Sequence, residues 1–305
     1  MKFPDFMPRI LLTGGTGFFG KSLLLWLLVN NIECELWIIS RKPQEFMAAN
    51  PWFYLPNCYL IPGSILDCQL PGGAFDYVIH AATIPAKDSE IEYFTIKSTR
   101  RMLDFCQHSG AKMLYLSSGA VYGKHYSVDS LTEDTDLQPF TAYGVAKAKA
   151  EELILKTNVT SVIARCFAFI GPFIDYHIHY AAGDFLLAAQ HGQPIKMTGN
   201  GQVRRSYLDA DDWAEWCLQL LVNGNGIYNV GSNHAVSTLE LAQTIQRTYG
   251  RKEEIQINSA APGEDWCYIP DINKIKHDLA VQPTLNLTQS IEKIININKF
   301  LASGD

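Results

Sequence analysis

The sequence predicts an α/β fold: a doubly wound parallel sheet with a smaller lobe interleaved towards the C-terminus. Short apolar runs alternate with helical stretches along the first half of the 305-residue chain, which is the order of parallel βαβ units. A glycine-rich turn joins the first of these runs to the first helix. Runs such as YVIHAA and MLYLSS are almost uniformly apolar, as strands buried on both faces require.

The elements follow in order along the chain. The predicted strands of the first part are RILLTG (9–14), CELWIIS (34–40), NCYLIPG (57–63), FDYVIHAA (75–82), AKMLYLSS (111–118) and SVIARCFAF (161–169). Helices are expected between them at 21–31, around 90–108 and at 143–156. Beyond Gly171-Pro172 we expect a helix in 181–194, two short strands around a turn in 195–208, a helix in 209–221, a strand in 226–232, and closing helices near 238–249 and 287–301.

No repeat, low-complexity stretch or flexible linker divides the chain, so a second lobe has to be interleaved with the first. We expect residues 1–171 plus about 207–233 to form a dinucleotide-binding domain of the Rossmann type. Residues of about 172–206 plus 234–305 are then expected to form a substrate-binding lobe.

Composition excludes several classes of protein. The net charge of -6 and the absence of long basic runs argue against a nucleic-acid or anionic-membrane surface. The N-terminus lacks the apolar core of a signal peptide, and the apolar run 23–29 is about half a membrane span, so it is expected to be a buried helix. Seven scattered cysteines without a CxxC predict neither a disulfide framework nor a metal site, and a reduced cytoplasm is expected.

The stretch LLTGGTGFFG places Gly14, Gly17 and Gly20 between a strand and a helix in the spacing GxxGxxG. Such a turn lets the backbone approach a pyrophosphate, and the helix N-terminus offers it free N–H groups. A structural turn is the alternative, but the position after the first strand favours dinucleotide binding. The predicted cofactor contacts are Thr13, Gly14, Gly17, Phe18, Phe19, Gly20, Ser40, Arg41, Lys42, Ser64, Ile65, Ala81, Ala82, Thr83, Ser117, Tyr143, Lys147, Phe169 and Ile170.

The end of the second strand, WIISRKP, carries Ser40, Arg41 and Lys42 where an NAD-binding site usually has a carboxylate. Arginine suits the 2′-phosphate of NADP, so NADP is preferred and NAD is the alternative. A solvated loop with two basic residues would look the same. His80, in the fourth predicted strand, is expected to be buried and structural.

The stretch AYGVAKAKAEE places Tyr143 and Lys147 one helical turn apart, on one face of a helix. A nearby ammonium favours the phenolate and so tunes the tyrosine for proton transfer. Ser118 ends the preceding strand in LYLSSGAVYG and is expected beside the phenol. We therefore predict Ser118, Tyr143 and Lys147 as catalytic residues.

These motifs, in this order, resemble the extended short-chain dehydrogenases/reductases, the NAD-dependent epimerase/dehydratase group that acts on nucleotide sugars. TGGTGFFG is similar to its TGxxGxxG, SSGAVYG to its SSxxVYG, YGVAK to its YxxxK, ARCFAFIGP to its RxFNxxGP and GQVRRSYLDADDWA to its GxxxRDFxxVDDxA. The resemblance implies that Tyr143 exchanges a proton with a sugar oxygen, that Ser118 bonds the same oxygen, and that Lys147 holds the nicotinamide ribose. It also implies that Arg205 touches the nucleotide diphosphate, and that two copies associate through a four-helix bundle formed by helices near 90–108 and 143–156.

Four positions depart from the family pattern. Its 4,6-dehydratases carry an Asp-Glu pair where this chain has Gly119 and Ala120, so dehydration is not expected. Ala168 stands in place of the asparagine near the substrate, and Ser64 in place of an aspartate near the adenine. The expected reaction is reduction of a 4-keto-(6-deoxy) nucleotide sugar, with 4-epimerisation on tightly held NAD as the alternative and a non-catalytic NADP-sensing protein as a remote one.

The predicted substrate contacts are Ser118, Ala120, Ala168, His177, His179 and Arg205. Each of the two histidines either contacts the sugar or diphosphate or faces solvent from its loop.

Overall fold

Seven parallel strands form one sheet in the order β3-β2-β1-β4-β5-β6-β11. The computed structural model describes residues 7–84, 88–126, 128–174, 181–258 and 266–303. The strands are β1 (Arg9–Thr13), β2 (Glu35–Ser40), β3 (Cys58–Pro62), β4 (Tyr77–His80), β5 (Lys112–Ser118), β6 (Ser161–Cys166) and β11 (Gly226–Val230). Chain order reverses where β1 lies between β2 and β4. In open α/β sheets ligands bind at the carboxyl edge beside this switch point.

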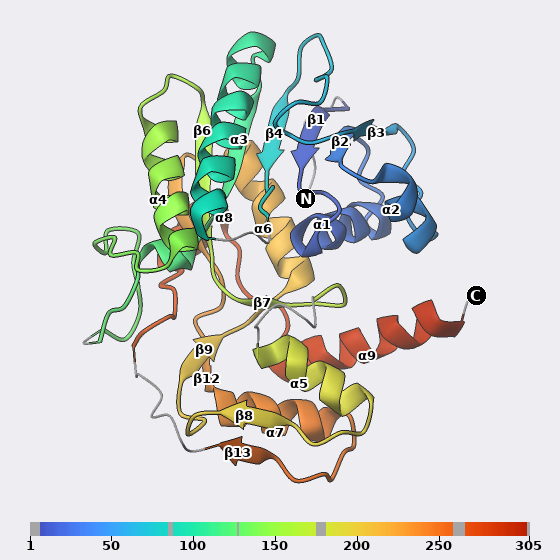
Figure 1. Ribbon diagram of the computed structural model, residues 1–305, viewed down its shortest axis with the longest axis vertical. Helices are drawn as coiled ribbons and strands as arrows, with labels where there is room; N and C mark the ends of the chain where they lie inside the picture. The colour runs from blue at the N-terminus through green and yellow to red at the C-terminus, as the bar shows by residue number, and fades with distance from the viewer. Residues whose placement is uncertain (1–6, 85–87, 127, 175–180, 259–265, 304–305) are drawn as a thin grey trace.

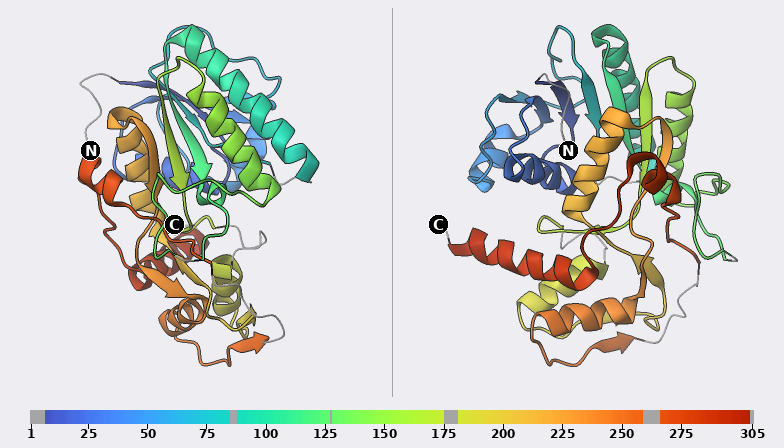
Figure 2. Two further views of the ribbon diagram at one scale, coloured as in Figure 1. Left: turned by 90° about the vertical axis from the view of Figure 1, so that its left-hand side faces the viewer. Right: turned by 180° about the vertical axis from the view of Figure 1, so that it is seen from behind.

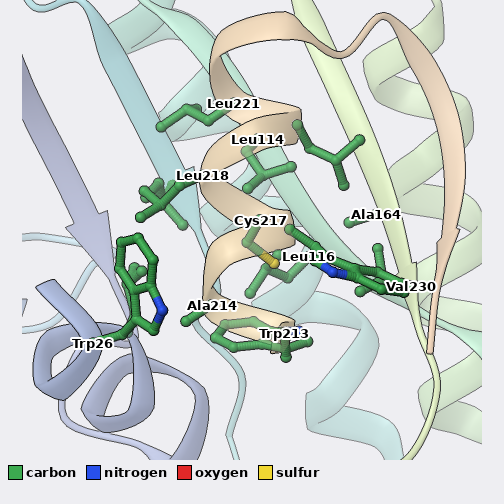
Figure 3. Packing of buried hydrophobic residues seen from close by; sticks show 14 of the residues in the cluster. Trp26, Leu114, Leu116, Ala164, Trp213, Ala214, Cys217, Leu218, Leu221 and Val230 are labelled. Atoms are coloured by element: carbon green, nitrogen blue, oxygen red, sulfur yellow. The ribbon is translucent and has the colours of Figure 1, made fainter. Parts of the chain in front are cut away.

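Helices cover both faces of the sheet (Figures 1 and 2). One face carries α1 (Phe18–Val29), α2 (Pro43–Ala49), α6 (Ala210–Asn223) and α8 (Asn273–Leu279), and the other carries α3 (Asp88–Ser109) and α4 (Ala142–Leu155). Figure 3 shows the core under α6, where Trp213 and Cys217 pack against Leu116 and Val230. Burial of each large apolar side chain there contributes about 1.5–3 kcal/mol. The sheet is thus a rigid support for whatever its carboxyl edge carries.

The lower part of the molecule in Figure 1 is built mainly from the second half of the chain. Its elements are α5 (Ala181–Gln190), β8 (Lys196–Thr198), β9 (Arg204–Ser206), β12 (Ala235–Ser237), α7 (Thr238–Thr248), β13 (Gln256–Asn258) and α9 (Leu287–Ser303). β9 pairs with β12 and β8 with β13, while β7 (Phe169–Ile170) pairs with β10 (Leu208–Asp209) at the junction with the sheet. A separate apolar cluster, including Phe185, Leu241 and Ile291, holds this lobe together.

The predicted fold class is confirmed, with strands in each of the seven runs expected for the sheet. Several local details differ. α1 begins at Phe18 rather than Lys21, because the turn ends at the N-cap Gly17. The two short strands expected to flank one turn, β8 and β9, pair with distant partners instead of with each other. Residues 272–281 also pack on the core of the sheet.

Candidate active site

At two of its glycines the turn between β1 and α1 lies too close to neighbouring backbone for a side chain to fit without a shift. Gly14 has φ +74°, and a Cβ on it would lie 2.7 Å from the carbonyl carbon of Ala81. A Cβ on Gly20 would lie 2.2 Å from the Cα of Gly15. Gly17 is the N-cap of α1 and makes no side-chain cap hydrogen bond. The N–H groups of the first turn are therefore open to an acceptor from outside the helix. This cradle fits the pyrophosphate of a dinucleotide.

A buried chain of hydrogen bonds ties β1 to β4 and α3 beside this turn. Thr13 Oγ1 accepts the N–H of Ala82 at 3.1 Å and lies 2.8 Å from Nδ1 of His80, whose Nε2 lies 3.3 Å from Thr99 Oγ1. Burial lowers the pKa of His80 to about 3, so the ring is neutral. With Thr13 donating to Nδ1, Nε2–H donates to Thr99. His80 is therefore structural, as expected.

A group of packed aromatic rings lies beside the glycine turn. Phe18 stacks on Phe169 with centroids 4.1 Å apart, Phe169 stacks on Trp213 at 5.2 Å, and Phe19 meets Trp213 edge-on at 4.8 Å. Phe169 and Ile170 are buried. Of these predicted cofactor contacts, the rings mainly serve to anchor the turn on the sheet.

At the end of β2 the polar groups divide into buried and exposed ones. Ser40 is buried, and its hydroxyl accepts the N–H of Lys42 at 3.3 Å. The side chain of Lys42 pairs with Glu45 at 2.8 Å, whereas Arg41 is exposed and forms no ion pair with any residue that the structure describes. The carbonyl of Ser40 accepts the N–H of Gly63, which brings Ser64 and the buried Ile65 to the same edge. Arg41 is thus the cation available at this edge.

Lys147 is almost fully buried and points at the end of β5. Its Nζ donates to the carbonyl of Leu116 at 2.7 Å and lies over two rings, 4.7 Å from the centroid of Tyr115 and 5.8 Å from that of Tyr143. Burial lowers the pKa of Lys147 to about 8, against the opposing effect of nearby Cys166 and Glu151. The predicted pair of Tyr143 and Lys147 therefore shares one face of α4 with the ammonium beside the phenol.

Ser118 ends β5 and caps the short 3-10 helix η1 (Gly119–Val121), accepting the N–H of Ala120 at 3.2 Å. The start of α4 lies against η1, because a Cβ on Gly144 would be 2.5 Å from the carbonyl oxygen of Ala120. The fold thus brings the helix start that carries Tyr143 to the turn that carries Ser118. A Cβ on Gly119 would lie 2.9 Å from the ring of Phe167, so a side chain at position 119 would require that ring to shift.

Ser117 differs from its neighbour. Its buried hydroxyl donates to Glu151 on α4, and Glu151 in turn binds Arg165 of β6. Of the other predicted cofactor contacts, Ala81 and Ala82 are half-buried and Thr83 is exposed after β4.

On the side of the second lobe, Arg205 of β9 lies on two aromatic rings. Its guanidinium carbon is 4.4 Å from the Trp266 ring centroid and 5.2 Å from that of Tyr268. Burial lowers its pKa from the usual value. The predicted contact Ala168 precedes β7, and its carbonyl accepts the N–H of Leu208 at 3.1 Å. His177 and His179 lie outside the described residues.

Sequence reasoning missed both Trp266 and Glu151. Trp266 follows no periodic pattern that would mark it, and only the folded chain brings it to Arg205. Glu151 could have been found, because it follows Lys147 by the same one-turn spacing that joins Lys147 to Tyr143. Among the described residues no cluster of three or more metal-ligating side chains is present. None of the helices described is both long enough and apolar enough to cross a membrane.

Known proteins are similar to this chain over most of its length. The model of the NAD dependent epimerase/dehydratase family matches residues 10–231. Curated relatives include UDP-glucuronic acid decarboxylase 4 of Arabidopsis thaliana, 25% identical over 97% of this chain and 70% of that protein. Another is an uncharacterized UDP-glucose epimerase, YtcB, of Bacillus subtilis, 27% identical over 97% of this chain and 100% of that protein.

Solved structures show the same fold. UDP-glucose 4-epimerase of Thermotoga maritima, with UDP-glucose, superposes with a TM-score of 0.83 at 20% identity, covering 96% of this chain and 99% of that one. UDP-glucuronic acid 4-epimerase of Bacillus cereus, with UDP-glucuronic acid and NAD, gives a TM-score of 0.81 at 23% identity, covering 96% and 99%. The family model spans most of the chain and includes the glycine turn, Ser118, Tyr143 and Lys147, so this chain belongs to the NAD dependent epimerase/dehydratase family.

Proposed function

We propose that this enzyme reduces a 4-keto-(6-deoxy) nucleotide sugar. The observation that carries the proposal is the turn after Ser118, where the side chains of Gly119 and Ala120 supply no proton donor or acceptor and the ring of Phe167 packs against position 119. Elimination of water requires such groups beside the sugar, whereas ketone reduction requires one acid and a hydride donor. The site is equipped for the second reaction.

A bound dinucleotide supplies the hydride, and the chain supplies the proton and the positioning. Tyr143 donates its phenolic proton to the ketone oxygen as charge develops there. Ser118 donates a hydrogen bond to the same oxygen, and the Lys147 ammonium stabilises the tyrosinate that is left. Lys147 is also placed to hold the ribose next to the nicotinamide. These three side chains are the proposed catalytic set.

We propose NADPH as the preferred reductant. Arg41 is exposed at the end of β2 without an ion-pair partner among the described residues, and the two residues directly after Ser40 carry no carboxylate to bond a ribose 2′-hydroxyl. A guanidinium binds a 2′-phosphate with paired donors. NAD, which is bound in relatives of the same fold, is the alternative that an epimerase would retain.

Residues 1–171 plus about 207–233 are proposed to hold the dinucleotide, and most of residues 172–206 plus 234–305 to hold the substrate. Arg205 is the proposed contact to the diphosphate, positioned by Trp266 and Tyr268. Ala120 and Ala168 are proposed to line the sugar subsite. The packing of residues 272–281 on the sheet supports grouping them with the first unit.

A homodimer through α3 and α4 is proposed as the assembly. The two helices pack side by side, joined by an ion pair of 2.7 Å between Glu92 and Lys149. They expose Tyr93 and Leu155, at 61% and 59% of their surface. Light scattering of the purified protein tests this assembly. The free thiols of all seven cysteines accord with the proposed cytoplasmic location.

The test of the function offers the purified enzyme a panel of nucleotide 4-keto-6-deoxysugars with NADPH or NADH and follows the absorbance of the reduced cofactor. A reductase oxidises the cofactor with at least one ketone. Interconversion of 4-epimers without added cofactor, and without cofactor oxidation, would establish the epimerase instead.

A further inference from the structure

A third side chain on the catalytic face of α4 contacts the end of β5. Tyr143, Lys147 and Glu151 are each one helical turn apart. Lys147 donates to the carbonyl of Leu116, and Glu151 accepts the hydroxyl hydrogen bond of Ser117, the next residue of β5. The residue after that is Ser118. Two successive buried bonds therefore fix the position of α4 along β5, immediately before the two catalytic hydroxyls.

Glu151 is held by more than Ser117. Glu151 is 2% exposed, and its carboxylate accepts two hydrogen bonds from Arg165, with Nη2 at 2.8 Å and Nε at 3.1 Å from Oε2. Arg165 is the register partner of Ser117 on β6 and is itself buried. A buried carboxylate that accepts two hydrogen bonds from one guanidinium has a fixed position, because any movement would leave a buried charge unpaired.

A chain of hydrogen bonds links Arg165 to the segment that carries Tyr268, which contacts Arg205. Its Nη1 donates to the Tyr122 hydroxyl at 3.0 Å, which donates to Asn229 at 2.6 Å. Asn229 then donates to the carbonyls of Leu131 and Asp271. The chain preceding Asp271 includes Tyr268, one of the two rings beneath Arg205.

We propose that Glu151 is a positioning residue for the reaction: its carboxylate fixes α4 on β5 so that Tyr143 meets Ser118. The inference rests on the proposed roles of Tyr143 and Lys147. The titratable groups around Lys147 are Tyr115 on β5, His80 on β4, Cys166 on β6, and Tyr143 and Glu151 on α4. Of these, Glu151 is the one whose side chain hydrogen-bonds to both β5, at Ser117, and β6, at Arg165.

The experiment compares Glu151→Gln with Glu152→Gln in the full-length enzyme. Glu152 is the matched control, because it is the next residue of α4, is exposed, and pairs only with Lys156 among the described residues. We expect Glu151→Gln to lower kcat by about 10-fold to 100-fold with little change in KM for the sugar. We also expect the alkaline limb of its pH profile to move about one unit lower, because an anion that favours the ammonium is gone. Glu152→Gln should keep the wild-type kcat and profile.

Two further variants keep the test decisive if Glu151→Gln does not fold. Ser117→Ala removes one bond and leaves the buried ion pair intact, so kcat should fall while the alkaline limb stays in place. Glu151→Leu combined with Arg165→Met removes an anion and the cation bonded to it, so the limb should stay close to its wild-type position while kcat falls with the lost bond to Ser117. A folded Glu151→Gln enzyme with the kcat and pH profile of Glu152→Gln would overturn the proposal, and so would these two variants with the kcat of Glu152→Gln. Tyr143→Phe separates the two levels: if it turns over normally the proposed function fails, and if it is inactive while Glu151→Gln is normal only this inference fails.

Discussion

Two regions of the site are built in different ways. One is the carboxyl edge of the sheet, and the other is the wall formed by Arg205 with Trp266 and Tyr268. At the edge, Ser118 and Lys147 are 8% and 3% exposed, and hydrogen bonds to backbone groups of Ala120 and Leu116 hold them. At the wall, Arg205 is only partly buried and is held by ring contacts with Trp266 and Tyr268. Two isolated bridges, His125 to Cys267 and Leu131 to Pro270, attach this segment to the loop after β5.

The difference teaches where chemistry and specificity reside. Groups that transfer a proton must be placed to within a fraction of an ångström, and the core of the sheet provides that precision. Groups that recognise a substrate can be exchanged on a surface without disturbing the sheet. We therefore expect substitutions at the edge to act on kcat and substitutions at the wall to act on KM.

Among the substitutions at the carboxyl edge, Tyr143→Phe is expected to have the largest effect on kcat. Loss of the phenolic proton removes the general acid and should lower kcat by about 10²-fold to 10⁴-fold. Cofactor affinity, followed by quenching of tryptophan fluorescence, should persist because the glycine turn is untouched. Unchanged turnover would remove Tyr143 from the mechanism, and a protein without turnover even before mutation would support the non-catalytic alternative.

Gly20→Ala should damage the edge through its backbone. The new methyl would lie 2.2 Å from Gly15 Cα, so α1 must shift, and we expect a loss of about 1–3 kcal/mol in the free energy of unfolding together with weakened cofactor binding. Gly72→Ala is the control, since nothing lies within 4 Å of a Cβ there. Thermal unfolding and cofactor titration measure both effects. Equal behaviour of the two variants would show that the turn tolerates a side chain.

Much of the edge could be predicted from the sequence, because the relevant information is local. The glycine spacing, Ser118 at a strand end, and Tyr143 and Lys147 at one-turn spacing each specify a short structure that needs no distant partner. The wall could not be predicted in the same way. Trp266 reaches Arg205 only after the chain has crossed from one lobe to the other, and β8 and β9 choose partners far along the sequence.

Arg205→Ala tests the wall. Removing a charge-assisted contact to a phosphate should raise KM for the nucleotide sugar by roughly 10-fold to 100-fold and leave kcat close to wild type. Arg204→Ala is the control, because its side chain is exposed on the adjacent position of β9. Steady-state kinetics with saturating cofactor give the two constants. A fall in kcat with constant KM would place Arg205 with the catalytic groups and erase the distinction between the two regions.

A smaller effect is expected at the exposed end of β2. Arg41→Ala should weaken NADPH binding by about 10-fold and leave NADH binding unchanged, because only NADPH carries the 2′-phosphate. The difference should shrink as salt is added, since the contact is exposed. Fluorescence titration with each reduced cofactor at two ionic strengths measures it. Equal losses for NADPH and NADH would contradict the preference for NADPH.

The smallest effect is expected from pH alone. Burial lowers the pKa of Lys147 to about 8 from 10.5, so its ammonium is present below that pH and is lost as the pH rises through it. The kcat of the wild-type enzyme should therefore decline above about pH 8. A profile that stays flat to pH 10 would show that Lys147 keeps its proton or that turnover does not need it.

The most direct test of the central claim is the stoichiometry between cofactor oxidised and sugar converted. Enzyme, NADPH and a nucleotide 4-keto-6-deoxysugar are mixed, and loss of absorbance of NADPH is compared with product quantified by chromatography. The proposed reductase consumes NADPH mole for mole with the ketone. Conversion of a sugar to its 4-epimer with no net loss of reduced cofactor would contradict it.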